Sequence, residues 1–139
     1  MKKNSSSSGQ RRESRGRRLL RYVLGIALLV ALATMIGAMG AHVFKPRLSL
    51  DRYEVLQTAV HYQFFQALGL VLIGVLAERV AAPLLRTAGA LLLIGVVLFS
   101  GSLYLLVAGA PTSIGLVTPI GGVFMIVAWL LIAGTLLRR

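Results

Sequence analysis

The sequence predicts an all-α fold, an integral membrane four-helix bundle with both termini in the cytoplasm. The chain of 139 residues is 57% hydrophobic and only 14% charged, whereas an ordinary soluble domain has about 25% charged residues. Its apolar residues gather into four stretches, each close to the roughly 20 residues that cross a bilayer as a helix. We expect these spans at about residues 22–43, 53–77, 87–108 and 119–137.

The first 18 residues, MKKNSSSSGQRRESRGRR, are rich in Ser, Gly and Arg and show no apolar periodicity. Such a segment cannot bury enough apolar surface to offset the entropy lost on ordering, so we predict a disordered basic tail over 1–18 ahead of a four-span domain over 19–139. The apolar run at 19–43 exceeds the roughly 7–15 residues of a signal-peptide core, which favours an uncleaved first helix.

Positive charges set the expected topology, because Lys and Arg are enriched in the cytoplasmic segments of membrane proteins. With both ends inside, those segments hold twelve of the fifteen Lys and Arg residues. The other three are Lys45, Arg47 and Arg52. The formal net charge of +11 therefore indicates contact with anionic lipid at the basic tail and no nucleic acid, since nothing in the chain resembles a nucleic-acid-binding module.

Small residues predict where the helices pack closely, because no hydrophobic force draws helices together in lipid. In the first span Ala33, Gly37 and Ala41 recur every four residues, with Gly40 beside them. The glycines expected at close helix contacts are Gly37, Gly40, Gly101, Gly121 and Gly122.

Two helix starts are also predicted. Asp51 followed by Glu54 ahead of an apolar run resembles the capping pattern of a helix N-terminus. Thr118 followed by Pro119 gives the last helix a favourable N-cap and first residue.

Polar side chains concentrate in the first half of the second span, where lipid would not tolerate them. The predicted topology brings them to the outer leaflet together with polar residues of the other spans. This predicted polar layer consists of His42, Gln57, His61, Tyr62, Gln63, Gln66, Ser100, Ser102, Tyr104 and Thr118. It would either line a pocket for a polar ligand or join helices through hydrogen bonds, and both interpretations stay open.

No catalytic constellation is visible. The chain has no cysteine, and its four acidic residues lie in the tail or at the ends of the spans. His42 ends the first span, whereas His61 lies about eight residues into the second, a difference in depth of about 12 Å at 1.5 Å per residue. We therefore expect no enzyme activity, no metal site and no cofactor.

Four phrases taken together resemble a known family. They are residues 37–42 (GAMGAH), 59–63 (AVHYQ), 99–104 (FSGSLY) and 118–122 (TPIGG). In order and spacing they are similar to the small four-helix membrane proteins related to bacterial YgdD and to eukaryotic transmembrane protein 256. The resemblance implies a four-span inner-membrane protein, and no established activity comes with it.

The chain departs from the family pattern at two positions. Gln66 stands where the resemblance leads us to expect a histidine, and Met39 stands where it leads us to expect an aromatic residue. An amide forms hydrogen bonds but carries no proton near neutral pH. A mechanism that needs an imidazole at position 66 would therefore be unavailable here.

Three functional hypotheses follow. The chain would be a structural or accessory protein of the membrane that joins a homo-oligomer or a membrane protein complex. Alternatively, it would be a small oligomeric transporter or channel for a polar solute. A third possibility is a lipid- or quinone-binding component of an enzyme.

Overall fold

Four long helices make up most of the protein. The computed structural model describes residues 5–80 and 83–137, and no strand occurs among them. The helices are α1 (Ser5–Met39), α2 (Leu50–Arg79), α3 (Pro83–Val107) and α4 (Val117–Leu137). Four helical stretches within the described chain are long and apolar enough to cross a membrane, at Leu19–Phe44, Leu50–Arg79, Pro83–Val107 and Thr112–Leu137. The prediction of an all-helical protein with four apolar spans is confirmed.

Two short helical turns adjoin the long helices. The first, η1 (Gly40–Phe44), is a π-helical turn that continues α1, and the backbone N–H of Lys45 donates to the carbonyl of Gly40 at 2.9 Å. The second, η2 (Thr112–Leu116), is a 3₁₀ turn that leads into α4. The helix N-cap of α2 is Ser49, whose side chain accepts from the Arg52 N–H at 3.5 Å. The start signal that we assigned to Asp51 and Glu54 therefore lies inside the helix.

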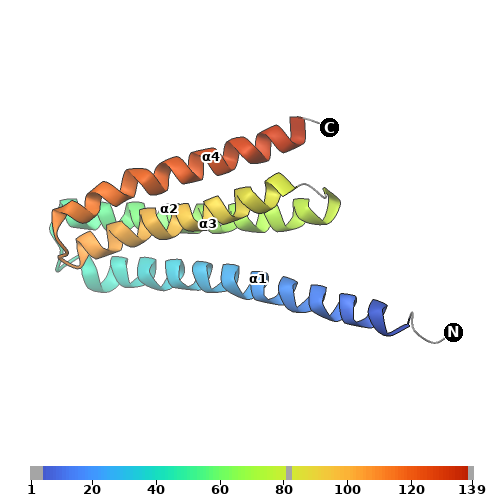
Figure 1. Ribbon diagram of the computed structural model, residues 1–139. Helices are drawn as coiled ribbons and strands as arrows, with labels where there is room; N and C mark the ends of the chain where they lie inside the picture. The colour runs from blue at the N-terminus through green and yellow to red at the C-terminus, as the bar shows by residue number, and fades with distance from the viewer. Residues whose placement is uncertain (1–4, 81–82, 138–139) are drawn as a thin grey trace.

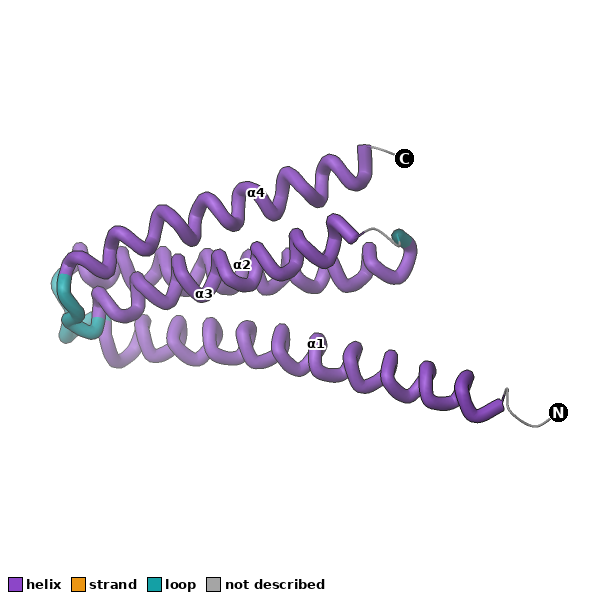
Figure 2. The backbone as a smooth tube through the Cα atoms, viewed as in Figure 1, coloured by secondary structure: helices purple, strands orange, loops and turns teal. Residues whose placement is uncertain are grey.

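The helices contact one another mainly in chain order. α2 packs against α1 and α3, and α4 packs against α3. Figure 1 shows α2 and α3 at the centre, with α1 and α4 on opposite sides of them. The tube in Figure 2 shows the described chain beginning and ending at the same end of the molecule. The bundle is therefore open, because α1 does not close on α4.

The first helix begins much earlier than the span it contains. The prediction placed residues 1–18 in a disordered tail, but α1 is helical from Ser5, while residues 1–4 lie outside the described part. Extending an existing helix adds one hydrogen bond per residue without a new nucleation cost. A polar segment can therefore continue a stable span as helix. The division into a tail and a four-span domain stays a prediction.

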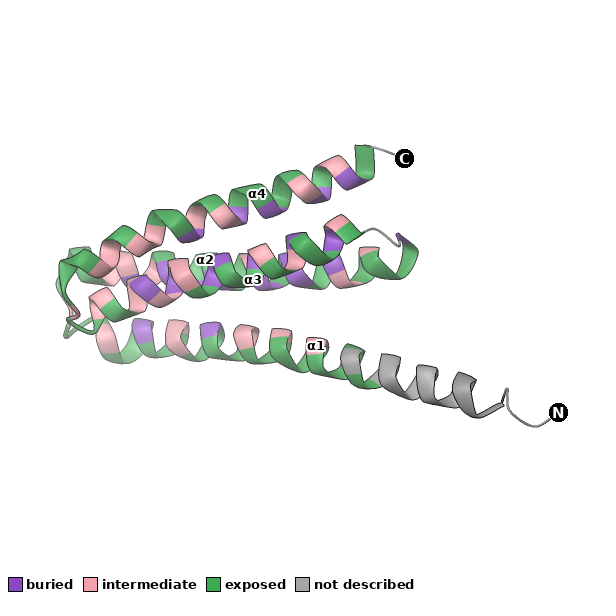
Figure 3. Ribbon diagram, in the orientation of Figure 1, coloured by how far each residue is buried: buried purple, intermediate pink, exposed green. Residues whose placement is uncertain are grey.

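Burial follows the helix contacts (Figure 3), since buried residues lie on the faces that the helices turn toward one another. The main core is formed by α2, α3 and α4, and its fully buried residues include Leu85, Ala88, Leu92 and Ala128. α1 is the least buried span, with 17% of its most apolar window inside the protein against 39% for α2. The apolar side chains that remain exposed suit contact with lipid.

Candidate functional site

Gln63 joins three helices. It lies on α2, is only 5% exposed, and uses both ends of its amide. Its Nε2 donates to the backbone carbonyl of Leu29 in α1 at 2.8 Å, and its Oε1 accepts from the hydroxyl of Tyr104 in α3 at 2.8 Å. A carbonyl can only accept, so the contact with Leu29 fixes which end of the amide is the nitrogen. Both polar ends of this buried side chain are therefore occupied by protein.

Ser100 links α3 directly to α2. Its Oγ donates to the backbone carbonyl of Ala59 at 2.9 Å, and the two residues are 2% and 0% exposed. Many serines in helices bond to their own backbone one turn earlier. Here the hydroxyl crosses to a neighbouring helix, because Ala59 presents only a methyl group and allows the two backbones to approach.

Ser102 and Thr118 link α3 to α4. Ser102 donates to the carbonyl of Phe99 at 2.9 Å, and its Oγ lies 2.7 Å from Oγ1 of Thr118. A hydroxyl carries one proton, so when Ser102 donates to Phe99 the Thr118 hydroxyl must be the donor in the second bond. Thr118 is therefore not the N-cap that we predicted. α4 begins at Val117, directly after η2, and the Thr118 side chain serves the contact between helices.

Gln66 forms a further polar contact between helices. Trp129, the only tryptophan of the chain, donates its indole N–H from α4 to the amide oxygen of Gln66 in α2 at 2.8 Å. Gly69 makes this approach possible, since a Cβ there would lie 2.8 Å from the indole ring. The sequence analysis missed Trp129 because an apolar span gives no indication of which way an indole points.

The structure divides the predicted polar layer into two groups. His42, His61 and Tyr62 are exposed, and neither histidine bonds to another described residue. The Tyr62 ring lies on Phe99, with 4.6 Å between ring centroids, while the amide of Gln57 lies near Gly40. The other seven members are buried or half-buried. Two of these are Gln57 and Gln66, and the remaining five form what we call the bonded layer: Gln63, Ser100, Ser102, Tyr104 and Thr118.

The bonded layer leaves no buried polar group unpaired. Among the described residues, every buried side-chain nitrogen or oxygen has a hydrogen-bond partner. The same part of the chain contains no group of three His, Cys, Asp or Glu side chains placed to hold a metal ion. The arrangement connects helices, and it presents no cluster of convergent groups to a solute.

Small residues shape the contact between α1 and α2. Ala33 is fully buried, and Cβ atoms at Gly37 and Gly40 would lie 3.2 Å from Val60 and 3.3 Å from Leu56. Ala41, which we expected on this face, is exposed. Ala33, Gly37 and Gly40 follow the spacing of four and three residues that keeps side chains on one face of a regular helix, and Ala41 falls beside this face.

The closest approach of α3 and α4 occurs at Gly95 and Gly121. A Cβ at Gly121 would lie 2.5 Å from the backbone nitrogen of Phe99 and 2.7 Å from the carbonyl of Gly95. Gly95, which the sequence analysis did not select, is therefore as important to this contact as Gly121. Gly101 was predicted to pack closely, but a Cβ there would meet nothing within 4 Å, and one at Gly122 would make only ordinary contact with the Phe99 ring.

Together, the four apolar helices and the hydrogen bonds between them define a multi-pass membrane protein. Comparison with known proteins gives its family. Residues 36–122, more than half of the chain, match the family model described as "Protein of unknown function (DUF423)". The chain belongs to this family.

Several relatives are similar over most of their length. UPF0382 membrane protein SH2409 of Staphylococcus haemolyticus is 42% identical over 109 residues, which cover 76% of this chain and 88% of the relative. UPF0382 membrane protein YwdK of Bacillus subtilis is 39% identical over 111 residues, covering 79% and 89%. UPF0382 inner membrane protein YgdD of Escherichia coli is 34% identical over 96 residues, covering 69% and 73%. The predicted resemblance to YgdD-related proteins is confirmed.

No solved structure matches the chain at a significant level.

Proposed function

We propose that this protein is a structural or accessory component of the cell (inner or plasma) membrane that binds other membrane proteins and has no catalytic role. The observation that carries the proposal is the pairing of Gln63 with both Leu29 and Tyr104. The most buried amide of the span bonds to a neighbouring helix through both its nitrogen and its oxygen, and these contacts compete with any substrate.

The same observation disfavours a transporter or channel within one chain. A path for a polar solute needs side chains that exchange their partners for the solute, or water that bridges them. In the bonded layer each buried polar atom already has a protein partner. Such hydrogen bonds in membranes are worth about 0.6–2 kcal/mol each, which is enough to fix helix positions.

The outer face of α1 is the surface on which we place the partner. α1 contacts α2 on one side only, and Leu28 and Leu32 on its other faces are 63% and 47% exposed. An edge helix that is mostly unburied can accept another transmembrane helix without disturbing the core. A second copy of this chain and a different membrane protein are both compatible with this surface.

Photo-crosslinking tests the proposal. A photoreactive residue at Leu28 or Leu32 is expected to give discrete protein adducts in native membranes, and the same partner should co-purify in mild detergent. A photoreactive residue at Ile126 on α4, which is equally exposed at 61%, is the matched control and should give mainly lipid adducts. A protein that forms no discrete adduct and always emerges as a monomer would contradict the proposal.

We also propose that both ends face the cytoplasm. The support is the charge asymmetry of the sequence together with the position of the two ends on one side of the bundle (Figure 1). An impermeant thiol reagent applied to intact cells should label an Arg47→Cys variant and should label Arg86→Cys only after permeabilisation. The reverse pattern would invert the topology.

A further inference from the structure

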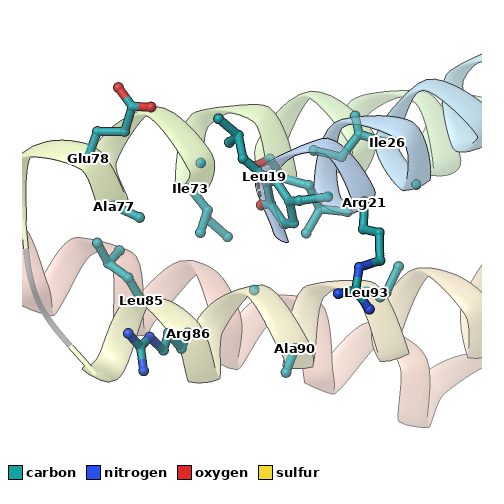
Figure 4. Close-up of a pocket in the computed structure, with 15 residues that line it drawn as sticks. Leu19, Arg21, Ile26, Ile73, Ala77, Glu78, Leu85, Arg86, Ala90 and Leu93 are labelled. Atoms are coloured by element: carbon teal, nitrogen blue, oxygen red, sulfur yellow. Dashed lines mark hydrogen bonds between the residues drawn. The ribbon is translucent and has the colours of Figure 1, made fainter. Parts of the chain in front are cut away.

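A cavity of about 630 Å³ lies between α1, α2 and α3, away from the bonded layer and at the end where the described chain begins and ends. Its volume is in the range of ligand pockets, about 300–1,000 Å³. Figure 4 shows Leu19, Ile26, Ile73, Leu85 and Leu93 among its walls. The sequence analysis did not predict this cavity.

The cavity exists because α1 packs on α2 and leaves a gap toward α3. Tyr22 fixes one side of it, since its hydroxyl donates to the carbonyl of Leu70 and its ring covers Gly74. Gly25 contributes the space itself, because a Cβ at this position would meet nothing within 4 Å. The gap opens sideways, as Leu19 and Leu93 line it and are 51% and 43% exposed.

Charged side chains stand at the edge of this apolar space. Arg21 lies near the start of the first span, Arg86 near the start of the third and Glu78 near the end of the second, so all three lie toward the same end of the bundle. In Figure 4 Arg21 reaches from α1 toward α3, whereas the carboxylate of Glu78 points away from the space between the helices. The edge is therefore cationic where it faces the cavity.

The two guanidinium groups are available to an anion. The Nε of Arg21 donates to the carbonyl of Arg17 at 3.3 Å, and no described side chain pairs with its terminal Nη groups or with Arg86. Guanidinium groups bind phosphate in bidentate fashion through two N–H donors. Arginines at the ends of spans lie at the level of lipid headgroups.

From this combination we infer that the cavity binds an anionic phospholipid, with an acyl chain between α1, α2 and α3 and the headgroup phosphate at Arg21, while Arg86 adds positive charge further along α3. An apolar space of this size that opens into the bilayer fills with hydrocarbon, and the two separate cations favour a negatively charged headgroup. A neutral quinone would make apolar contacts with the residues that line the cavity, but it carries no negative charge to pair with the arginines. This inference does not rest on the proposed partner surface, but the two border each other, because Arg21 lies on the same stripe of α1 as Leu28 and Leu32.

Native mass spectrometry of the full chain, extracted from bilayers of equal phosphatidylglycerol and phosphatidylcholine, tests the site. The unaltered protein should retain one phosphatidylglycerol. The double variant Arg21→Gln/Arg86→Gln should lose this preference by about tenfold, as expected for losing a charge-assisted hydrogen bond. The matched control Arg47→Gln/Arg52→Gln removes the same charge at the other membrane surface and should retain the lipid unchanged.

A second pair of variants tests the acyl-chain site. Gly25→Leu and Ala90→Leu fill the cavity and should abolish retention of both lipids, whereas Gly101→Leu, which replaces a glycine facing open space, should not. The unfolding temperature of each variant confirms that it is folded. The inference is overturned if the arginine variant keeps its preference, if both filling variants retain phosphatidylglycerol, or if the unaltered protein retains no lipid at all.

Discussion

The hydroxyl of Tyr104 donates to the amide oxygen of Gln63 at 2.8 Å, across 41 positions of the chain. The same amide reaches Leu29 on the other side, so one side chain of α2 holds both of its neighbouring helices. A buried amide within the membrane has no water as an alternative hydrogen-bond partner. The two bonds therefore fix the rotation of α1 and α3 relative to α2.

Replacing Gln63 by Leu should destabilise the protein by about 1–3 kcal/mol, because it removes both bonds and leaves the Tyr104 hydroxyl half-buried without its acceptor. Tyr104→Phe should cost less, since only one bond is lost. The free energy of unfolding in a detergent titration measures both, and the double variant should show a coupling of about 0.6 kcal/mol. Additive losses would mean that the bond does not form.

Glycine positions that look equivalent in the sequence should respond differently to alanine. Gly121→Ala places a methyl group against the backbone of Phe99 and Gly95, so α3 and α4 must separate, at a cost of about 1–3 kcal/mol. Gly101→Ala meets open space and should be neutral or slightly stabilising. Thermal unfolding of the two variants in one detergent compares them. A loss of equal size at both positions would contradict the close contact at Gly121.

The number and approximate bounds of the spans could be predicted because lipid demands long apolar stretches. Whether an individual residue faces lipid or another helix could not be predicted. In a soluble helix the polar face marks the outside, but a membrane helix is apolar toward both lipid and protein. The sequence therefore gave no means to distinguish Gln63, which is buried, from His61, which lies two residues earlier and is exposed.

Close contacts and cavities depend on where and at what angle two helices cross. The amino-acid sequence alone does not specify these crossing positions. Gly101 and Gly95 lie on the same helix six residues apart, yet only Gly95 meets α4. The space beside Gly25 likewise arises because α1 packs on α2 and leaves a gap toward α3. The prediction of a four-helix bundle gave no reason to expect a cavity at that end.

The single tryptophan reports on the contact between α2 and α4. Gln66→Leu removes the acceptor of the Trp129 indole N–H, so the fluorescence emission should shift to shorter wavelength while stability falls by only about 0.6 kcal/mol. Gln57→Leu, which changes an amide without a bond to Trp129, is the control and should leave the emission unchanged. An unaltered spectrum in Gln66→Leu would show that the indole is not bonded to Gln66.

Thiol labelling separates a pocket from helix contacts, because the chain has no cysteine. Ser100→Cys replaces a side chain that is 2% exposed and bonded to Ala59, so it should resist both impermeant and membrane-permeant maleimides. His61→Cys is exposed on the same half of the bundle and should react with the permeant reagent. Since the buried polar atoms of the bonded layer already have protein partners, the impermeant reagent should fail to reach position 100 in sealed vesicles of either orientation. Rapid labelling of Ser100→Cys by that reagent would instead reveal an aqueous pocket, and would favour a transport function over a structural one.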